Sequence, residues 1–363
     1  MAPFAERDGD IANAWMEGLG NVVVPREPLL PLSHSVNSKL TTLCPRLDAW
    51  LRGGVPTRSV TEITGEAGSA KTQLALQLLI AAQLPREMGG LDGAAVYVHT
   101  EGRAPLTRLK QLVASHPAVA AFVDRAKKKT KTDFDKPDFD LMRGVYVAET
   151  LDDPDGLWTA LVSVASVLRD TKKKRVRLLV VDSVSSPFRE EDASRANGAF
   201  SRARVLGRVA ALLREYAHRH DIAVVVTNHV VDAFGNSEDN ARSDSHADQS
   251  CGPLLKKQNV FGPAGVVSSS GRDVAPALGL FWANCVNTRL FLRRSGGSAG
   301  GFGGGEGVGG GGVVGGVTRE ACVVFSSHLP HCRDAEEGGA PIPFVVRKEG
   351  VFGLPSSGVS ADE

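Results

Sequence analysis

Residues 65–72 have the types and the spacing of a loop that holds phosphate. The segment reads G-E-A-G-S-A-K-T, follows a β-rich run and opens an apolar stretch with helical spacing. In such loops backbone N–H groups at a helix N-terminus surround phosphate oxygens, a lysine reaches the β- and γ-phosphates, and a hydroxyl ligates Mg²⁺. The sequence therefore predicts a nucleotide site with the loop residues Gly65, Glu66, Ala67, Gly68, Ser69, Ala70, Lys71, Thr72 and Gln73.

One position of this loop departs from the usual pattern. Ala70 stands where the motif has its second glycine. We expect its methyl group to add a Cβ near the β-phosphate and to penalise a positive φ angle. Gly68, two residues earlier, offsets some of the lost freedom. The departure leaves a second interpretation open, in which the segment is only a glycine turn that caps an ordinary helix.

Two carboxylates that follow apolar runs complete a candidate catalytic set. Asp182 comes directly after the run 178–181, and a carboxylate at the tip of a buried strand can hold the water shell of Mg²⁺. Thr72 and Asp182 are therefore the predicted metal residues. Glu101 ends another such run and is predicted to orient and deprotonate the attacking water. The alternative for each is an ordinary strand-end acid, and His99 is expected to be a core or supporting histidine.

The elements that must position these residues alternate along the chain. Apolar runs with strand character and segments with helical spacing follow one another, which favours a mostly parallel, twisted sheet with helices on both faces. The predicted strands are 59–64, 94–100, 145–148, 178–181 and 222–227, and the predicted helices are 71–84, 106–115, 153–169 and 202–218.

The C-terminal third has a different pattern. Strands at 288–293 and 320–325 predict a β-hairpin, and its tip holds the tract 296–316 with 14 of the 40 glycines of the chain. A last strand is expected at 344–347. The predicted organisation is a partly disordered arm (1–38), an α/β core (39–354) that includes a long polar loop (232–275), and a tail (355–363).

Composition narrows the class of protein. The 42 Lys and Arg residues balance 41 Asp and Glu residues, so the chain is not histone-like or polyanionic, and contacts with nucleic acid must come from local patches. No apolar run is long enough to span a membrane, and no secretory signal is evident. The five cysteines lack zinc-site spacing. Two basic runs, 125–131 and 172–177, are expected in the loops that connect strands and helices. They could contact DNA phosphates, act as nuclear import signals, or simply be solvated loops.

Several motifs outside the phosphate loop resemble those of RecA-type recombinases, specifically the eukaryotic recombinase paralogues of homologous recombination. The resemblance covers about residues 38–354, and 276–284 together with 328–330 are most similar to one paralogue. The residues that carry it are Leu40-Thr-Thr, Leu47-Asp, Arg52-Gly-Gly, Thr61-Glu, Lys71-Thr-Gln, Gln83-Leu-Pro, Gly89-Gly, Tyr97-Val-His-Thr-Glu, Val180-Val-Asp-Ser, Val226-Thr-Asn, Pro276-Ala-Leu-Gly, Trp282-Ala-Asn and Arg289-Leu.

The resemblance implies a RecA-like P-loop NTPase core that binds ATP and Mg²⁺ and hydrolyses ATP weakly, stimulated by DNA. It also implies a nuclear protein that mediates the homologous-recombination repair of DNA double-strand breaks. The implied partners are another recombinase paralogue in a heterodimer, the main recombinase, and single-stranded or branched DNA; no membrane is implied.

The resemblance also assigns roles to residues. Arg108 would flank the adenine, and His229 stands where the recombinases have a glutamine that senses the γ-phosphate, which gives Lys71, Glu101 and His229 as the catalytic set. Segments 186–201 and 230–275 would face DNA, and 328–330 would cap the ATP of a neighbouring subunit.

Departures from the family pattern keep a rival interpretation open. They include Ala70, His229, the acids at 190–192 and an eroded N-terminal DNA-binding bundle. The rival is a non-catalytic RecA-fold scaffold that binds DNA and partner recombinases. A weaker option is a RecA-fold ATPase that works outside recombination.

Overall fold

A computed structural model describes residues 38–129, 140–150, 153–170, 172–189, 198–232, 267–270, 272–294, 318–330 and 340–355. The glycine tract 296–316, the acids at 190–192, and nearly all of the predicted arm and tail lie outside these residues. The boundaries 1–38, 39–354 and 355–363 therefore stay predictions.

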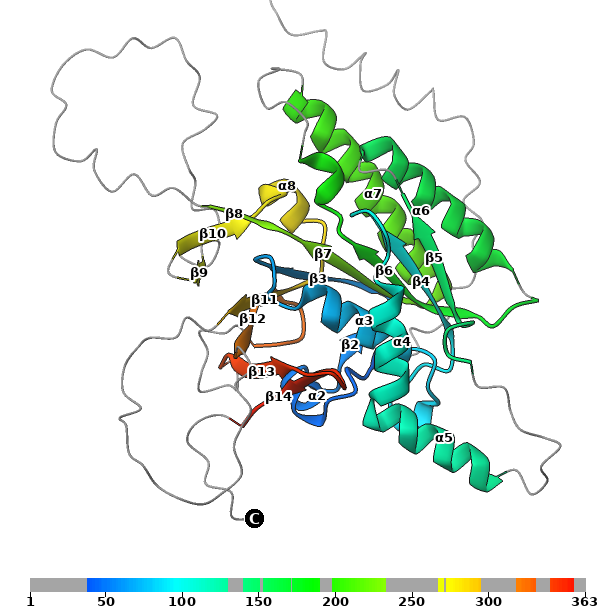
Figure 1. The fold of residues 1–363 in the computed structure, drawn as a ribbon. Helices are drawn as coiled ribbons and strands as arrows, with labels where there is room; N and C mark the ends of the chain where they lie inside the picture. Colours follow the sequence, from blue (N-terminus) through cyan, green and yellow to red (C-terminus); the bar gives the residue numbers. More distant parts are fainter. Residues whose placement is uncertain are drawn as a thin grey trace, which may run out of the picture. The chain divides into compact units, whose positions relative to one another are not determined.

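Within the described residues, one nine-stranded sheet forms the centre of the fold, in the order β14-β13-β12-β11-β3-β7-β6-β4-β5 (Figure 1). Neighbours from β11 to β5 pair in parallel, whereas β11 to β14 pair antiparallel. This confirms the predicted mostly parallel sheet and the hairpin of β11 and β12. The bounds are β3 Ser59–Gly65, β4 Ala94–His99, β5 Val145–Glu149, β6 Val176–Asp182, β7 Ala223–Asn228, β11 Thr288–Arg294, β12 Arg319–Ser326, β13 Ile342–Val346 and β14 Val351–Gly353.

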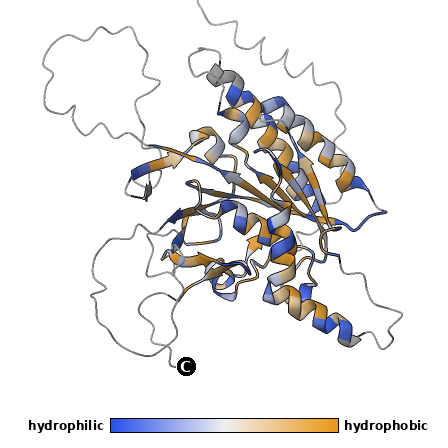
Figure 2. Ribbon diagram, in the orientation of Figure 1, coloured by the Kyte–Doolittle hydropathy of each residue, from blue (hydrophilic) through white to orange (hydrophobic). Residues whose placement is uncertain are grey.

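Helices cover both faces of this sheet because every second side chain of a strand points to the opposite face. In β6, Leu178 and Val180 belong to the apolar cluster under α3 (Lys71–Ala81), α4 (Leu106–Ser115) and α5 (Pro117–Lys129). Leu179 and Val181 belong to the cluster under α6 (Pro154–Arg169) and α7 (Gly198–His220). Figure 2 shows the apolar strands between the two helical layers. The run is continuous in the sequence because both faces of the strand are buried.

Helix α5 was not predicted, and it corrects one expectation. Pro117 follows α4 closely and begins α5, in keeping with the suitability of proline for the first position of a helix. The basic run 125–131 therefore does not lie wholly in a connection, because 125–129 form the end of α5. Helix α7 also begins earlier, at Gly198, than the predicted 202.

The interval 232–275, predicted as one long loop, contains strands. β9 (Val267–Ser269) and β10 (Arg272–Pro276) join β8 (Val230–Asp232) in a three-stranded antiparallel sheet; residues 233–266 lie outside the described part. Val274 of β10 is buried against Phe291 and Val324. Packing on β11 and β12 thus stabilises strands whose polar sequence has no clear alternation.

The remaining elements are short and lie near the N-terminal and C-terminal ends of the described core. β1 (Lys39–Leu40), α2 (Pro45–Trp50) and β2 (Val55–Pro56) lie at the start. At the other end, the single predicted strand 344–347 is in fact a hairpin, β13 and β14, whose turn is formed by 347–350. A further short helix, α8 (Gly279–Ala283), precedes β11. No helix of the described chain has the length and apolar character needed to cross a bilayer.

Candidate nucleotide site

The predicted phosphate loop connects the end of β3 to the start of α3. Ala70 is the residue before α3 and has φ 85° and ψ 17°, a left-handed conformation that an L-residue adopts at some cost. The expected positive φ is therefore present. The methyl group, however, is packed into the apolar cluster that also contains Leu74, with the residue only 7% exposed.

Glycine is required at the first position of the loop. A Cβ on Gly65 would lie 2.1 Å from the carbonyl oxygen of Leu292, its register partner in β11. Gly68 differs, since it has φ +76° and a Cβ there would meet nothing within 4 Å. The loop thus packs tightly against β11 at Gly65, whereas there is room for a side chain at Gly68.

Lys71 lies across the loop. Its Nζ donates to the carbonyl oxygens of Gly65 at 2.7 Å and Glu66 at 2.9 Å. Burial lowers the pKa of Lys71 to about 8, although the nearby Asp182 and Glu101 carboxylates act in the opposite direction. The ammonium group is therefore ready for an anion that would compensate its lost hydration.

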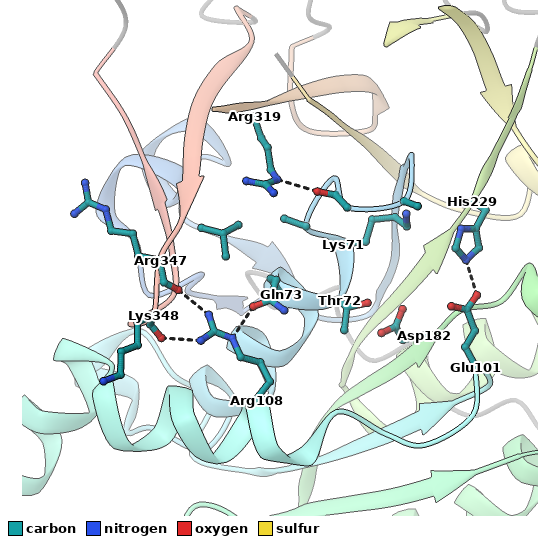
Figure 3. Close-up of a pocket in the computed structure, with 14 residues that line it drawn as sticks. Lys71, Thr72, Gln73, Glu101, Arg108, Asp182, His229, Arg319, Arg347 and Lys348 are labelled. Carbon is teal, nitrogen blue, oxygen red and sulfur yellow. Dashed lines mark hydrogen bonds and ion pairs between the residues drawn. The ribbon is translucent and has the colours of Figure 1, made fainter. Parts of the chain in front are cut away.

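Asp182 lies at the end of β6, and both of its carboxylate oxygens accept hydrogen bonds. Thr227 donates to Oδ1 at 2.5 Å, and the Tyr97 hydroxyl donates to Oδ2 at 2.9 Å. Asp182 and Thr72 line the same cavity (Figure 3). The two predicted metal residues are therefore brought together at the carboxyl edge of the sheet.

Glu101 is not a free strand-end acid. Its Oε1 accepts from His229 Nε2 at 2.6 Å, from Arg189 at 2.8 Å and from the Ser183 hydroxyl at 3.3 Å. The hydrogen bond from His229, followed by the charges of His229 and Arg189, outweighs burial and lowers the pKa of Glu101 to about 2. The structure thus places the predicted catalytic residues Glu101 and His229 in direct contact.

Arg108 joins three elements at the opposite end of the cavity. Its guanidinium donates to Gln73 Oε1 at 2.7 Å, to the Arg347 carbonyl at 2.7 Å and to the Lys348 carbonyl at 2.9 Å (Figure 3). It also donates to Gln111 on its own helix. Arg108 therefore fixes the β13–β14 turn against α3 and α4.

A cavity of about 600 Å³ contains most of these side chains. Four of its residues were not predicted from the sequence: Arg319, Val346, Arg347 and Lys348. Arg319 begins β12 and donates from Nε to the Gly68 carbonyl at 2.9 Å. In the sequence, the two adjacent basic residues at 347–348 were the signal that could have indicated this side of the cavity. The cavity is lined by Ala67, Gly68, Ala70, Lys71, Thr72, Gln73, Glu101, Arg108, Asp182, His229, Arg319, Val346, Arg347 and Lys348.

Three predicted loop residues do not line this cavity. Gly65 is the last residue of β3, and Ser69 is buried. Glu66 is directed toward the small sheet, where its carboxylate accepts from Ser270 at 2.7 Å and Arg272 at 3.2 Å. Burial acts to raise the pKa of Glu66, but hydrogen bonds from Ser270 and Arg272 together with the Arg272 charge hold it below its ordinary value.

A buried ion pair lies beneath the site. Glu62 of β3 is fully buried, and its Oε2 accepts from Arg289 of β11. Its Oε1 accepts from Asn228 Nδ2 at 2.7 Å and from Trp282 Nε1 at 3.1 Å. Four positions that carried the sequence resemblance thus form one hydrogen-bonded network in the middle of the sheet.

The second basic run, 172–177, lies at the other end of β6 from Asp182. Lys174 pairs with Asp92 at 2.9 Å, and the buried Arg177 pairs with Asp221 at 2.8 Å. These pairs support a structural role for much of the run.

Comparison with known proteins decides the family. A family model described as Rad51 matches residues 34–121 and 140–252, which is more than half of the chain. An Arabidopsis thaliana protein named DNA repair protein XRCC3 homolog is 32% identical over 322 residues, covering 87% of this chain and 93% of that relative. The chain belongs to the Rad51 family. Within it, the chain is an XRCC3-like RecA-type paralogue with the RecA-like α/β core.

Other members of the Rad51 family support this placement. The Bos taurus protein named DNA repair protein XRCC3 is 31% identical over 324 residues, covering 89% of this chain and 77% of the relative. The Aeropyrum pernix DNA repair and recombination protein RadA is 35% identical over 193 residues, 53% of each chain. The matched region of the family model includes the phosphate loop, Glu101, Asp182 and His229.

Proposed function

We propose that the chain binds ATP and Mg²⁺ in the 600 Å³ cavity and acts in homologous-recombination repair of DNA double-strand breaks. The observation that carries the nucleotide part is that Lys71, Thr72 and Asp182 meet at one cavity although they come from two separate parts of the chain. The repair part is supported by family membership and by the names of the relatives.

The residues present fit a magnesium nucleoside triphosphate. Cationic side chains approach the cavity from α3, α4 and β12, the β13–β14 turn lines its far end, and the space above Gly68 stays open. A hydroxyl and a carboxylate, Thr72 and Asp182, are oxygen donors of the kind that Mg²⁺ prefers. Bound Mg²⁺ would neutralise charge on the phosphate oxygens.

Each of these side chains would then contact or orient a different part of the bound nucleotide. Lys71 exchanges its two carbonyl acceptors for phosphate oxygens. Arg319 and the β13–β14 turn flank the ligand, and Arg108, the predicted adenine contact, keeps that turn in place. Glu101 is the predicted acceptor for the proton of the attacking water, and His229, which contacts it, is the predicted sensor of the γ-phosphate.

A variant of Lys71 tests the site. Lys71→Ala should weaken binding of a fluorescent ATP analogue at least about tenfold, because a charge-assisted contact is worth about 1.5–3 kcal/mol. Lys110→Ala, which removes an exposed lysine of α4, is the matched control and should bind as the wild type does. Wild-type affinity in Lys71→Ala would show that the site is assigned wrongly.

The clamped state of Glu101 favours a second candidate function. A carboxylate with a pKa of about 2 is a weak base, which suits a non-catalytic RecA-fold scaffold that binds DNA and partner recombinases. Single-turnover ATP hydrolysis with and without single-stranded DNA separates the two candidates. DNA-stimulated turnover that disappears in Glu101→Gln would reject the scaffold and support a weak ATPase.

We propose that the protein works in the nucleus as a heterodimer with another recombinase paralogue. Its further partners would be the main recombinase and single-stranded or branched DNA. Family membership and the predicted neighbour-capping turn at 328–330 support this assembly. Affinity purification from cells with damaged DNA, read by mass spectrometry, should recover at least one recombinase or paralogue. Recovery of none would contradict the assembly.

A further inference from the structure

Asp182 is held by a pair of buried hydroxyl groups from its two neighbouring strands. Thr227 lies on β7 and Tyr97 on β4, on either side of β6 in the sheet. Thr227 and Tyr97 are both fully buried, and Asp182 itself is only 5% exposed. Each carboxylate oxygen thus has one fixed donor, so the carboxylate has little freedom to rotate.

The Tyr97 hydroxyl also has a second neighbour. His99 Nδ1 lies 3.1 Å from it, and His99 Nε2 lies 3.0 Å from the backbone carbonyl oxygen of Glu101. Because a carbonyl oxygen only accepts, Nε2 carries the proton in this contact. The one proton of the Tyr97 hydroxyl is donated to Asp182, so none is left for His99 Nδ1.

We propose that Tyr97 and Thr227 are positioning residues that orient the Asp182 carboxylate toward Mg²⁺. The inference rests on the proposed nucleotide function and goes beyond it, since neither side chain lines the cavity and neither can touch the nucleotide. Groups that orient a metal-holding residue change metal affinity by about 10- to 100-fold when removed.

The test measures Mg²⁺ dependence rather than hydrolysis. Binding of a non-hydrolysable fluorescent ATP analogue to the full chain is titrated with Mg²⁺ and repeated in excess chelator. Tyr97→Phe removes one hydroxyl with little change in shape, and we expect its half-saturating Mg²⁺ concentration to rise at least about tenfold. Analogue binding in chelator should stay at the wild-type level, because the phosphate contacts are unchanged.

Tyr216→Phe is the matched control. Tyr216 is also buried, and its hydroxyl donates to the Leu161 carbonyl at 3.0 Å within the α6–α7 layer. This variant loses one buried hydrogen bond but should keep the wild-type Mg²⁺ dependence. A loss of fold stability alone would affect both tyrosine variants alike.

Thr227 provides a second, independent variant if Tyr97→Phe does not fold. Thr227→Val should shift the Mg²⁺ dependence in the same direction, and Thr227→Ser, which keeps the hydroxyl, should restore it. If the wild type requires Mg²⁺ but Tyr97→Phe and Thr227→Val match its midpoint, the positioning role is wrong and the nucleotide site stands. If the wild type does not bind the analogue even with Mg²⁺, the proposed function itself is wrong, and this inference with it.

Discussion

The Nε2 atom of His229 lies 2.6 Å from the Oε1 atom of Glu101, at one end of the proposed ATP cavity. This contact joins the segment just after β4 to the residue that follows β7, so the predicted catalytic carboxylate and the predicted phosphate sensor lie in direct contact. A ligand that moves His229 also changes the basicity of Glu101. If the proposed roles hold, nucleotide sensing and water activation would be coupled through this hydrogen bond.

Replacing His229 should change the pH dependence of hydrolysis. The folded-state pKa of Glu101 is depressed, so the carboxylate stays ionised until the pH falls toward about 2. In His229→Gln an uncharged amide replaces the imidazole, so the pKa of Glu101 rises toward its ordinary value. Between pH 4 and 8 the wild-type single-turnover rate should show no acid limb from Glu101, whereas the rate of His229→Gln should fall as the pH approaches 4.

The control for this prediction is His220→Gln, since His220 ends α7 away from the cavity. It should leave the pH profile unchanged. A rate of His229→Gln that stays as flat toward pH 4 as the wild-type rate would contradict the coupling.

Lys71 should take up a proton when nucleotide binds at alkaline pH. Its pKa is about 8 in the free protein because of burial, and the phosphate charges should raise it. Above pH 8, binding of ATP therefore requires protonation of Lys71, and the affinity should fall as the pH rises from 8 to 10. Isothermal titration calorimetry in buffers of different ionisation enthalpy measures this uptake.

In Lys71→Met the proton uptake near pH 8.5 should disappear, even where weak binding remains at high ligand concentration. The same uptake in Lys71→Met as in the wild type would assign the proton to another group.

Ala70→Gly should have a small effect on stability. Glycine relieves the left-handed conformation of Ala70, a gain of about 1 kcal/mol. It also removes a methyl group from the apolar cluster, a loss of about 0.8 kcal/mol. The two effects oppose each other, so the free energy of unfolding should change by less than about 1 kcal/mol in urea titrations.

Gly65→Ala is the informative comparison, because its Cβ would collide with the Leu292 carbonyl. It should destabilise the protein clearly more than Ala70→Gly does. If Ala70→Gly raised stability by several kcal/mol, strain at Ala70 would be larger than its conformation indicates.

Shortening the tract 296–316 to a brief Gly-Ser linker should leave ATP binding intact. β11 and β12 pair from Thr288 to Arg294 and from Arg319 to Ser326, so the hairpin is complete below the tract. Doubling a flexible loop costs only about 0.6 kcal/mol, so its length matters little for stability. Equilibrium binding of the fluorescent analogue measures the outcome, with Arg319→Ala as the variant expected to lose affinity.

Weakened binding in the shortened chain, with an unchanged melting temperature, would show that the tract itself contributes to the site.

The sequence predicted those parts of the site that are contiguous or that end an apolar strand. Lys71, Thr72, Glu101 and Asp182 fall in this group, because parallel strands bring their carboxyl ends to one edge. Arg319 and the β13–β14 turn were missed, since only the pairing of β11 with β3 brings them beside the phosphate loop. No local spacing encodes that pairing.

The same reason explains one of the errors in the fold. Strands β9 and β10 form where Val274 packs on Phe291, a contact between distant segments. These strands depend on neighbours in space rather than in the chain. Helix α5 is a different kind of omission, because Pro117 at its first position was a local signal that was not used.

The buried pair of Glu62 and Arg289 has a consequence for the cell. Loss of either partner leaves a charge without compensation in the sheet, at a cost of about 3–5 kcal/mol, a large part of the stability of an ordinary domain. Missense changes here would lower the amount of folded protein through quality control and leave the chemistry of surviving molecules unaltered. A repair defect caused by them should respond to overexpression or growth at lower temperature, whereas one caused by Lys71→Ala should not.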